Sequence, residues 1–186
     1  NLDSIKSDPK PMRDQKPINK KDYHLITDQN EIDKWIKEAE EVGEVAIDTE
    51  TSSLDPHQAD LIGVSLSSKV GKACYIPIGH NSKKCINKDV VLNKLKPLLE
   101  DSSIKKIGQN IKFDFIVLFK HGITISSIED TMLMSYVLDA GKNRHNMDTL
   151  SEIHLDHKTI KFKELVGSGK KEITFGEVDI EKAKDY

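Results

Sequence analysis

Three short apolar runs joined by turn-rich links constrain the fold of this chain more than any other feature. The runs cover Glu44–Asp48, Leu61–Ser67 and Ala73–Ile78, and the links contain Leu54–Pro56 and Ser67–Gly71. Runs of this length between turns rich in glycine, proline or serine are typical of β-strands. Because short links favour neighbouring antiparallel strands, we predict a three-stranded meander.

Helical patterns flank this meander. Asp28 and Glu31 resemble a capping box at the start of a helix, which Gly43 ends. An amphipathic helix with Pro97 inside it follows the meander, and Asn110–His121 predicts another helix. Further expected elements are a strand at Lys105–Gly108, a short run at Gly122–Ile125, and helices at Asp130–Leu138, Met147–Leu155 and Asp179–Tyr186. This order predicts an α/β fold in which helices flank a mixed sheet, as in the ribonuclease H-like architecture among several α/β options.

Composition bounds the possible classes of function. The chain has 186 residues with 28 Lys and Arg against 31 Asp and Glu, a net charge of −3, which predicts one domain whose overall charge does not favour nucleic acid. No apolar run approaches the roughly 18 residues of a membrane span, so we expect a cytoplasmic protein without membrane contact. Cys74 and Cys85 are expected to be reduced thiols. Residues 1–22, rich in lysine and proline, are interpreted as a linker.

Two carboxylates, Asp48 and Glu50, close the first strand-like run. Since side chains alternate along a strand, both project from one face about 7 Å apart, and we expect them at an edge of the sheet. Carboxylates so placed can hold Mg²⁺ or Mn²⁺, and two ions about 4 Å apart can promote phosphoryl transfer. The same spacing recurs in Asp179–Glu181, within a lysine-flanked stretch, so spacing alone leaves ordinary strand-end charges as an open alternative.

Asp114 is a second candidate for the same chemistry. Asn110 is a candidate helix N-cap, which places Asp114 one turn into the helix, among Phe113, Phe115 and Phe119. A carboxylate between aromatic side chains is unusual on a helix that faces only water. A surface aspartate favoured by the helix dipole is the competing interpretation.

Two longer motifs contain these carboxylates. Residues 48–55 (Asp-Thr-Glu-Thr-Ser-Ser-Leu-Asp) resemble the first exonuclease motif of the DEDD superfamily, and residues 108–114 (Gly-Gln-Asn-Ile-Lys-Phe-Asp) resemble the second. The segments 128–133, 144–150 and 157–160 resemble the intervening regions of bacterial family A DNA polymerases, the polymerase I type. The resemblance covers residues 23–186, and the linked set of motifs is far more specific than any one of them.

The resemblance implies a 3′→5′ proofreading exonuclease domain with a ribonuclease H-like fold, which hydrolyses DNA with two metal ions during replication and repair. Asp48, Glu50 and Asp114 match the metal ligands, for Mg²⁺ or Mn²⁺, with Zn²⁺ as an alternative at one site. Tyr186 matches the tyrosine that orients the attacking water. Positions that hold a single-stranded or frayed 3′ end of DNA match Thr51, Leu54, Gln109, Asn110, Phe113, Arg144 and Phe162. For the two phenylalanines, a plain core role stays open.

The sequence departs from the family pattern at Tyr186. The fourth carboxylate of the family is expected four residues further on, so the resemblance implies an exonuclease domain, 23–186, that is truncated at its C-terminus and lacks the polymerase module. We therefore expect weak or no activity from this chain alone. The implied partner is the polymerase module of the same polypeptide, in a monomeric protein associated with the nucleoid.

Two other functions stay open. An RNA-trimming exonuclease resembling ribonuclease D uses the same carboxylates, and a catalytically silent domain would only bind single strands or brace a polymerase. The basic segment around Phe162 is either a solvated loop or a contact to the phosphate backbone; its lysines are Lys158, Lys161, Lys163, Lys170 and Lys171. His154 and His157 have no further cluster near them in sequence, and a polar helix end is favoured over a zinc site.

Overall fold

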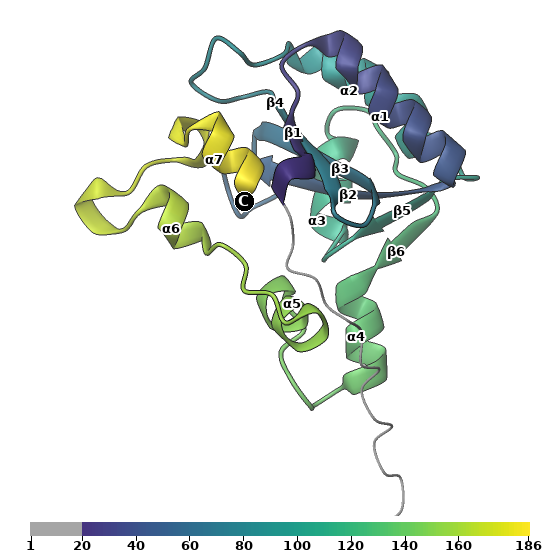
Figure 1. Ribbon diagram of the computed structural model, residues 1–186, viewed down its shortest axis with the longest axis vertical. Coiled ribbons are helices and arrows are strands. Elements are labelled where there is room, and N and C mark those ends of the chain that lie inside the picture. The colour runs from purple at the N-terminus through teal and green to yellow at the C-terminus, as the bar shows by residue number, and fades with distance from the viewer. Residues whose placement is uncertain (1–19) are drawn as a thin grey trace, which may run out of the picture.

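The computed structural model describes residues 20–186 (Figure 1), so most of the expected linker, 1–22, lies outside the described residues. Its last three residues, Lys20–Asp22, form the 3₁₀ helix η1. The Lys20 ammonium donates a hydrogen bond of 2.9 Å to the carbonyl of Asp185. The described residues thus include the last three residues of the predicted linker.

A six-stranded mixed sheet forms the centre of the described part, in the order β1-β4-β3-β2-β5-β6. The strands are β1 Tyr23–Leu25, β2 Glu44–Thr51, β3 Leu61–Lys69, β4 Lys72–Pro77, β5 Lys105–Gly108 and β6 Ile128–Asp130. β2, β3 and β4 form the predicted antiparallel meander, whereas β1, β5 and β6 pair with their neighbours in parallel. The sequence did not predict β1, and the run Gly122–Ile125 lies just before the last strand without forming one.

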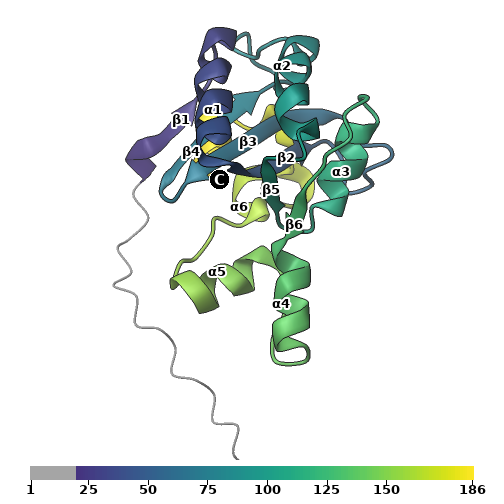
Figure 2. The same cartoon turned by 90° about the vertical axis from the view of Figure 1, so that its right-hand side faces the viewer.

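Helices flank this sheet, as predicted. They are α1 Gln29–Val42, α2 Lys88–Glu100, α3 Lys112–Phe119, α4 Thr131–Asp139, α5 Met147–Leu155, α6 Phe162–Val166 and α7 Ile180–Asp185, with 3₁₀ turns η2 Gly169–Lys171 and η3 Phe175–Glu177. α1 and α2 pack together, and α7 contacts β1 and β4. Figure 2 shows α4 and α5 beyond the end of the sheet, away from α1 and α2.

Most helices begin and end at residues of the types that cap helices. The Asp28 side chain accepts from the Asn30 N–H at 2.9 Å, and Gly43 ends α1 with a positive φ of 79°. Asp179 accepts from the Glu181 N–H, so the aspartate of the second Asp-x-Glu pair caps α7. The prediction for Asn110 is wrong: α3 starts after Ile111, and Asn110 instead takes a left-handed turn conformation with φ of 59°.

Two separate apolar cores hold the structure together. The larger one joins α1, α2 and α3 to the sheet and contains residues such as Ile32, Val64, Leu95 and Leu118. The smaller one joins the C-terminal segment to β3 and β4, and consists of Ile62, Tyr75, Val166, Phe175, Val178 and Ala183. Cys74 and Cys85 are free thiols, and Cys74 is buried in β4.

The buried side chains of His80 and Lys106 form hydrogen bonds inside this framework. His80 is buried between Tyr75, whose hydroxyl lies 2.6 Å from Nε2, and the Val178 carbonyl, 3.0 Å from Nδ1. Since a carbonyl only accepts, Nδ1 carries the proton and Tyr75 donates to Nε2. The ammonium of Lys106, fully buried in β5, donates to the carbonyls of Asp101 and Ile104 at 2.5 and 2.6 Å. It therefore stabilises the turn after α2.

Candidate active site

β2 positions the first two carboxylates. It lies inside the sheet between β3 and β5, so the prediction that Asp48 and Glu50 lie on an edge strand is wrong. Burial alternates along β2, with Ile47 and Thr49 buried on one face and Asp48 exposed on the other. A register shift follows Glu50 in the pairing with β3. The alternation therefore puts Asp48 and Glu50 on one face, as the sequence predicted.

α3 brings the third carboxylate to the same strand. Pairing between β2 and β5 reaches only Ala46 and Ile107, which leaves the following part of β2 next to α3. There Oδ1 of Asp114 accepts from the Thr49 N–H at 2.8 Å and from the Thr49 hydroxyl at 2.6 Å. Asp114 is buried, with 3% of its surface exposed. Two hydrogen bonds to one oxygen fix the carboxylate and leave Oδ2 for another partner.

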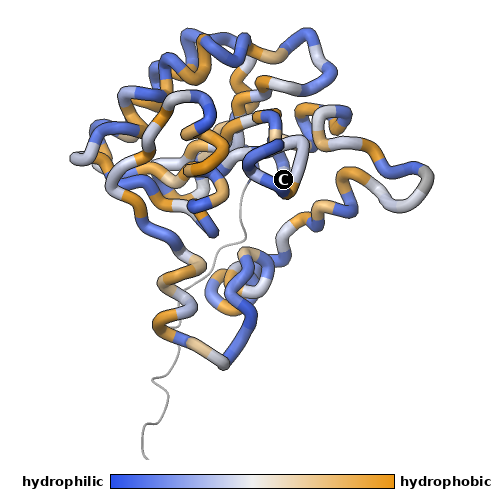
Figure 3. Tube along the Cα trace, turned by 180° about the vertical axis from the view of Figure 1, so that it is seen from behind, coloured by the Kyte–Doolittle hydropathy of each residue, from blue (hydrophilic) through white to orange (hydrophobic). Residues whose placement is uncertain are grey.

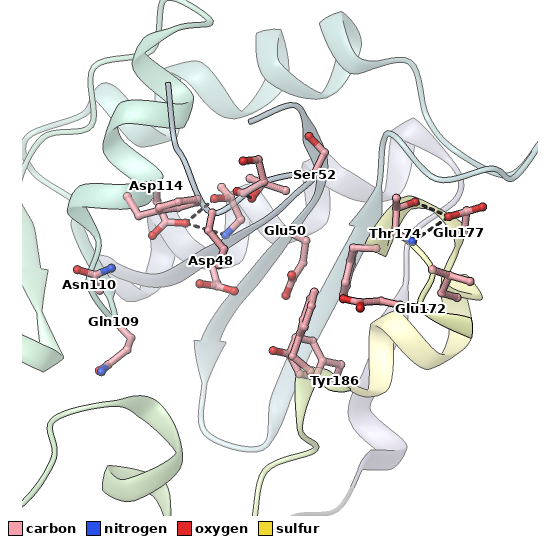
Figure 4. Close-up of a pocket in the computed structure, with 18 residues that line it drawn as sticks. Asp48, Glu50, Ser52, Gln109, Asn110, Asp114, Glu172, Thr174, Glu177 and Tyr186 are labelled. Carbon is pink, nitrogen blue, oxygen red and sulfur yellow. Dashed lines mark hydrogen bonds between the residues drawn. The ribbon is translucent and has the colours of Figure 1, made fainter. Parts of the chain in front are cut away.

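One cavity of about 870 Å³ brings the three carboxylates together. Its lining also includes the segment Glu172–Phe175 and Tyr186. Figure 4 shows Asp48 and Glu50 pointing into this space, with Asp114 beside Asp48 and Tyr186 facing Glu50. A second cavity of about 450 Å³ shares Asp48, Glu50 and Tyr186 with the first, so these residues lie where the two spaces meet.

The electrostatics of this cluster favour a bound cation. Burial, and then the charges of Asp48 and Asp114, raise the pKa of Glu50 to about 8. Burial, and then the charge of Asp114, raise the pKa of Asp48 to about 7. Because Asp48 faces the open cleft, solvent screens part of this effect. Burial raises the pKa of Asp114 to about 6 against the lowering effect of the Thr49 bonds. Carboxylates that resist ionisation in this way lose their mutual repulsion when a cation binds between them.

The donor set suits hard divalent cations, because it consists of carboxylate oxygens only. In the described residues, no three His, Cys, Asp or Glu side chains already converge as an ion-holding group.

Tyr186 closes the cavity from the C-terminal side. Its ring lies 6.0 Å from that of Phe175, and 44% of its surface stays exposed. Burial, and then the charges of Glu50 and Asp48, raise its pKa to about 12. The hydroxyl therefore stays protonated at neutral pH and can donate a hydrogen bond toward the carboxylates.

The other predicted site residues fall into two groups. Thr51, Leu54, Asn110, Phe113 and Phe162 line the larger cavity. Leu54 is 95% exposed and Phe162 46% exposed, so neither is a core residue, whereas Phe113 also packs against the main core. Arg144 is exposed and lines neither of the two cavities.

Gln109 lines both cavities, but its amide is already bonded within the protein. Its Nε2 donates to the His145 carbonyl at 2.7 Å, and its Oε1 accepts from the Thr131 hydroxyl at 2.5 Å. Gln109 therefore ties the end of β5 to α4 and to the turn before α5. The Asn110 N–H bonds to Asp130 at 2.9 Å and strengthens the same connection.

Sequence reasoning missed Thr49 as the partner of Asp114, and it missed Phe175. The ring of Phe175 is buried and stacks against Phe162 at 6.1 Å, so it supports both Phe162 and Tyr186. A signal for this segment was present in the sequence. Thr174 and Glu177 form a capping box, a pattern that predicts the start of a helical turn.

Comparisons with known proteins give a consistent result. A family model described as 3′-5′ exonuclease matches residues 23–186. DNA polymerase I of Pseudomonas aeruginosa is 43% identical over 171 residues, which are 89% of this chain and 19% of that protein. DNA polymerase I of Rhizobium leguminosarum is 41% identical, covering 91% of this chain and 19% of that protein. The chain thus spans about a fifth of the length of these relatives.

A solved structure agrees with the sequence matches. Brucella melitensis NrnC with bound Mg²⁺ is 34% identical with a TM-score of 0.52, covering 63% of this chain and 56% of that chain. The predicted ribonuclease H-like α/β fold is confirmed, and exonucleases of this kind use divalent metal ions. Within residues 20–186, no helix is long and apolar enough to cross a membrane.

Proposed function

The chain belongs to the 3′-5′ exonuclease family, and we propose that it removes nucleotides from the 3′ end of DNA by two-metal-ion phosphodiester hydrolysis. The observation that carries this proposal is the group of three carboxylates on one cavity, with Asp114 fixed by Thr49 against the strand that carries Asp48 and Glu50. The raised pKa values of these carboxylates support cation binding there.

Each part of the cavity has a proposed role. Asp48, Glu50 and Asp114 hold two Mg²⁺ or Mn²⁺ ions, with Zn²⁺ as an alternative at one position. When bound, the ions stabilise negative charge on the attacking and leaving oxygens. Tyr186 orients the water by donating a hydrogen bond.

The remaining cavity residues suit an unpaired DNA end. Leu54, Phe113 and Phe162 offer apolar and stacking surface to unpaired bases, and Thr51 and Asn110 offer polar contacts. Gln109 acts indirectly, by holding α4 and α5 in position. Arg144 reaches the phosphate backbone only when the DNA extends beyond the cavity. Because terminal bases must leave the duplex at a cost of a few kcal/mol, mismatched ends are cut faster than matched ones. We propose proofreading on this basis.

The relatives are longer polypeptides, and we propose the same arrangement for this protein: an exonuclease domain beside a polymerase module in one monomeric chain in the cytoplasm, near the nucleoid.

A nuclease assay tests the proposed function. The 186-residue chain and a chain extended beyond Tyr186 are incubated with 3′-matched and 3′-mismatched primers, with Mg²⁺ or with EDTA. Asp48→Ala and Asp114→Ala should lower hydrolysis by about 10³-fold, since each removes a metal ligand. Asp33→Ala, at an exposed ion pair on α1, is the matched control. Metal-independent cleavage, or full activity in either site variant, would contradict the proposal.

A ribo-oligonucleotide of the same sequence separates the open alternatives. Faster cleavage of RNA than of DNA would favour a ribonuclease D type of function. Binding of a single strand without any Mg²⁺-dependent cleavage, in the extended chain, would favour a catalytically silent domain.

A further inference from the structure

The buried pair Tyr75 and His80 lies on the face of the sheet that carries Glu50. The two residues are 2% and 7% exposed. In the pairing of β2 with β3, Gly63 lies opposite Glu50, and the side chains of opposite residues project from the same face. A Cβ at Gly63 would lie 2.0 Å from the Tyr75 hydroxyl, so this hydroxyl fills the place of the side chain across from Glu50. Tyr75 therefore links the carboxylate face of the sheet to His80.

His80 joins the sheet to the C-terminal segment. The Tyr75 hydroxyl donates to Nε2 over 2.6 Å, and the protonated Nδ1 donates to the Val178 carbonyl over 3.0 Å. The backbone just before His80 is also fixed, because the Gly79 N–H donates to the Ile62 carbonyl of β3 at 2.8 Å. Both ring nitrogens of His80 are thus bonded, one to the sheet and one to the residue that follows η3.

α7 connects this attachment to Tyr186. Val178 directly precedes Asp179, whose side chain caps α7 by accepting from the Glu181 N–H at 3.0 Å. At the other end of α7, the Tyr186 N–H donates to the Lys182 carbonyl at 3.1 Å. α7 contacts β1 and β4, and Figure 3 shows the C-terminus beside the main body. Because a helix is a rigid element with a rise of about 1.5 Å per residue, the position of Val178 determines where Tyr186 lies.

A row of aromatic rings reinforces the same connection. The ring of His80 lies 5.6 Å from that of Phe175, and the ring of Phe175 lies 6.0 Å from that of Tyr186. Tyr186 in turn faces Glu50 in the larger cavity (Figure 4). Both α7 and Phe175 therefore connect His80 to the tyrosine that closes the site.

We propose that His80 is a positioning residue for the exonuclease reaction, which together with Tyr75 holds the Tyr186 hydroxyl toward Glu50. The proposal rests on the proposed function. A buried imidazole is costly unless its nitrogens are bonded, because it gives up its hydrogen bonds to water. Burial lowers the pKa of His80, so the ring stays neutral at pH 7 and keeps one donor and one acceptor. Since hydrogen bonds are directional, they fix the C-terminal segment relative to the sheet more narrowly than apolar packing does.

Two substitutions of His80 separate its two hydrogen bonds. In His80→Asn, the amide nitrogen is bonded to Cγ, as Nδ1 is, and can still donate to the Val178 carbonyl. In His80→Gln, the amide reaches the place of Nε2 and can accept from Tyr75, but the Val178 carbonyl loses its donor. His121→Gln, in the turn after α3 and outside both cavities, is the control for the same change of side chain.

Single-turnover cleavage tests the proposal in the chain extended beyond Tyr186, with Mg²⁺ and a saturating single-stranded oligonucleotide. We expect His80→Gln to lower the cleavage rate at least about tenfold, since a misplacement of about 1 Å can lower a rate about 100-fold. His80→Asn should stay within about threefold of wild type, and His121→Gln should match wild type. Equal rates for His80→Gln and wild type would overturn the proposal, as would equal losses in both variants of His80.

A double-mutant cycle with Tyr186→Phe shows whether His80 acts through Tyr186. We expect Tyr186→Phe to lower the rate, and His80→Gln added to it to change the rate by less than about twofold, because the aligned hydroxyl is already lost. A histidine that only stabilises the protein would cause the same relative loss in both backgrounds, and this result would overturn the proposal. An unchanged rate in Tyr186→Phe alone would also overturn it.

Hydrogen exchange tests the positioning independently of nuclease activity. Exchange of the amides in 177–183 is measured in the extended chain in EDTA, with α1 as the internal reference. We expect His80→Gln to speed exchange in 177–183 at least about tenfold and to leave α1 unchanged, whereas His80→Asn resembles wild type. Unchanged exchange in 177–183, or equal acceleration in α1, would overturn the proposal. Absence of Mg²⁺-dependent cleavage in the extended wild-type chain would instead refute the proposed function, whatever the exchange data show.

Discussion

Replacing Glu50 by glutamine should stabilise the metal-free protein. Burial and the neighbouring carboxylates raise the pKa of Glu50 from 4.5 to about 8. At neutral pH the folded protein therefore keeps Glu50 protonated, whereas the unfolded chain ionises it, and this difference lowers the free energy of unfolding. Glutamine has nearly the same shape but does not titrate, so the variant is free of this cost.

The size of the effect follows from the pKa. At pH 7 the cost is set by the interval of about 2.5 pH units between the ordinary pKa of 4.5 and pH 7, which at about 1.4 kcal/mol per unit gives an upper limit of about 3.5 kcal/mol. Solvent in the cleft screens the charges, so we expect a gain of about 1 to 2 kcal/mol. Between about pH 4.5 and 8 the folded state binds more protons, so the wild-type protein loses stability as pH rises through this window.

Urea unfolding in EDTA measures this gain, with the fluorescence of the buried Trp35 as the probe. The advantage of Glu50→Gln should vanish near pH 4.5 and be largest above pH 8. Glu40→Gln, at an exposed position on α1, is the control. Added Mn²⁺ should stabilise the wild-type protein more than Glu50→Gln, since an amide is the weaker ligand. A Glu50→Gln variant that is less stable than wild type at pH 7, or equally altered at all pH values, would refute this reasoning.

Three further changes have distinct expected results. Thr49→Val removes one donor to Asp114 and should lower the single-turnover cleavage rate about tenfold without changing oligonucleotide affinity, as quench-flow and anisotropy would show. Lys106→Met leaves buried carbonyls without their donor and should lower the free energy of unfolding by about 3 kcal/mol in urea titrations. Burial lowers the pKa of His80, so stability should fall as pH drops below 6.5, where the unfolded chain takes up the proton; His80→Gln should show a flatter profile of unfolding midpoint against pH.

The sequence predicted the parts of the fold that local patterns specify. The limits of α5 and the antiparallel meander match the structure, and strand alternation placed Asp48 and Glu50 on one face. Contacts between distant residues were not predictable in this way. The bonds from Thr49 to Asp114 span 65 residues, and the bond from His80 to Val178 spans 98.

The predictions for short elements were wrong for a different physical reason. β1 has only three residues, too few for periodicity to show, and it forms because β4 offers a parallel edge. Asn110 resembles a helix cap, since asparagine favours that position, but asparagine also tolerates the left-handed conformation. The Asp130 carboxylate, 20 residues away, bonds the Asn110 N–H in that turn.

The division into two apolar cores has a consequence for how the protein opens. The small core holds the C-terminal segment that contains Phe175 and Tyr186, while Asp48 and Asp114 are held by the sheet and α3 next to the large core. Local stability varies across a structure, and regions with fewer buried apolar contacts open at a lower free energy, so we expect the smaller core to open first. We therefore expect the side of the cavity that carries Tyr186 to detach and return while the side that carries Asp48 and Asp114 stays folded. The proposed exonuclease activity would then depend on a local equilibrium that global unfolding experiments do not report.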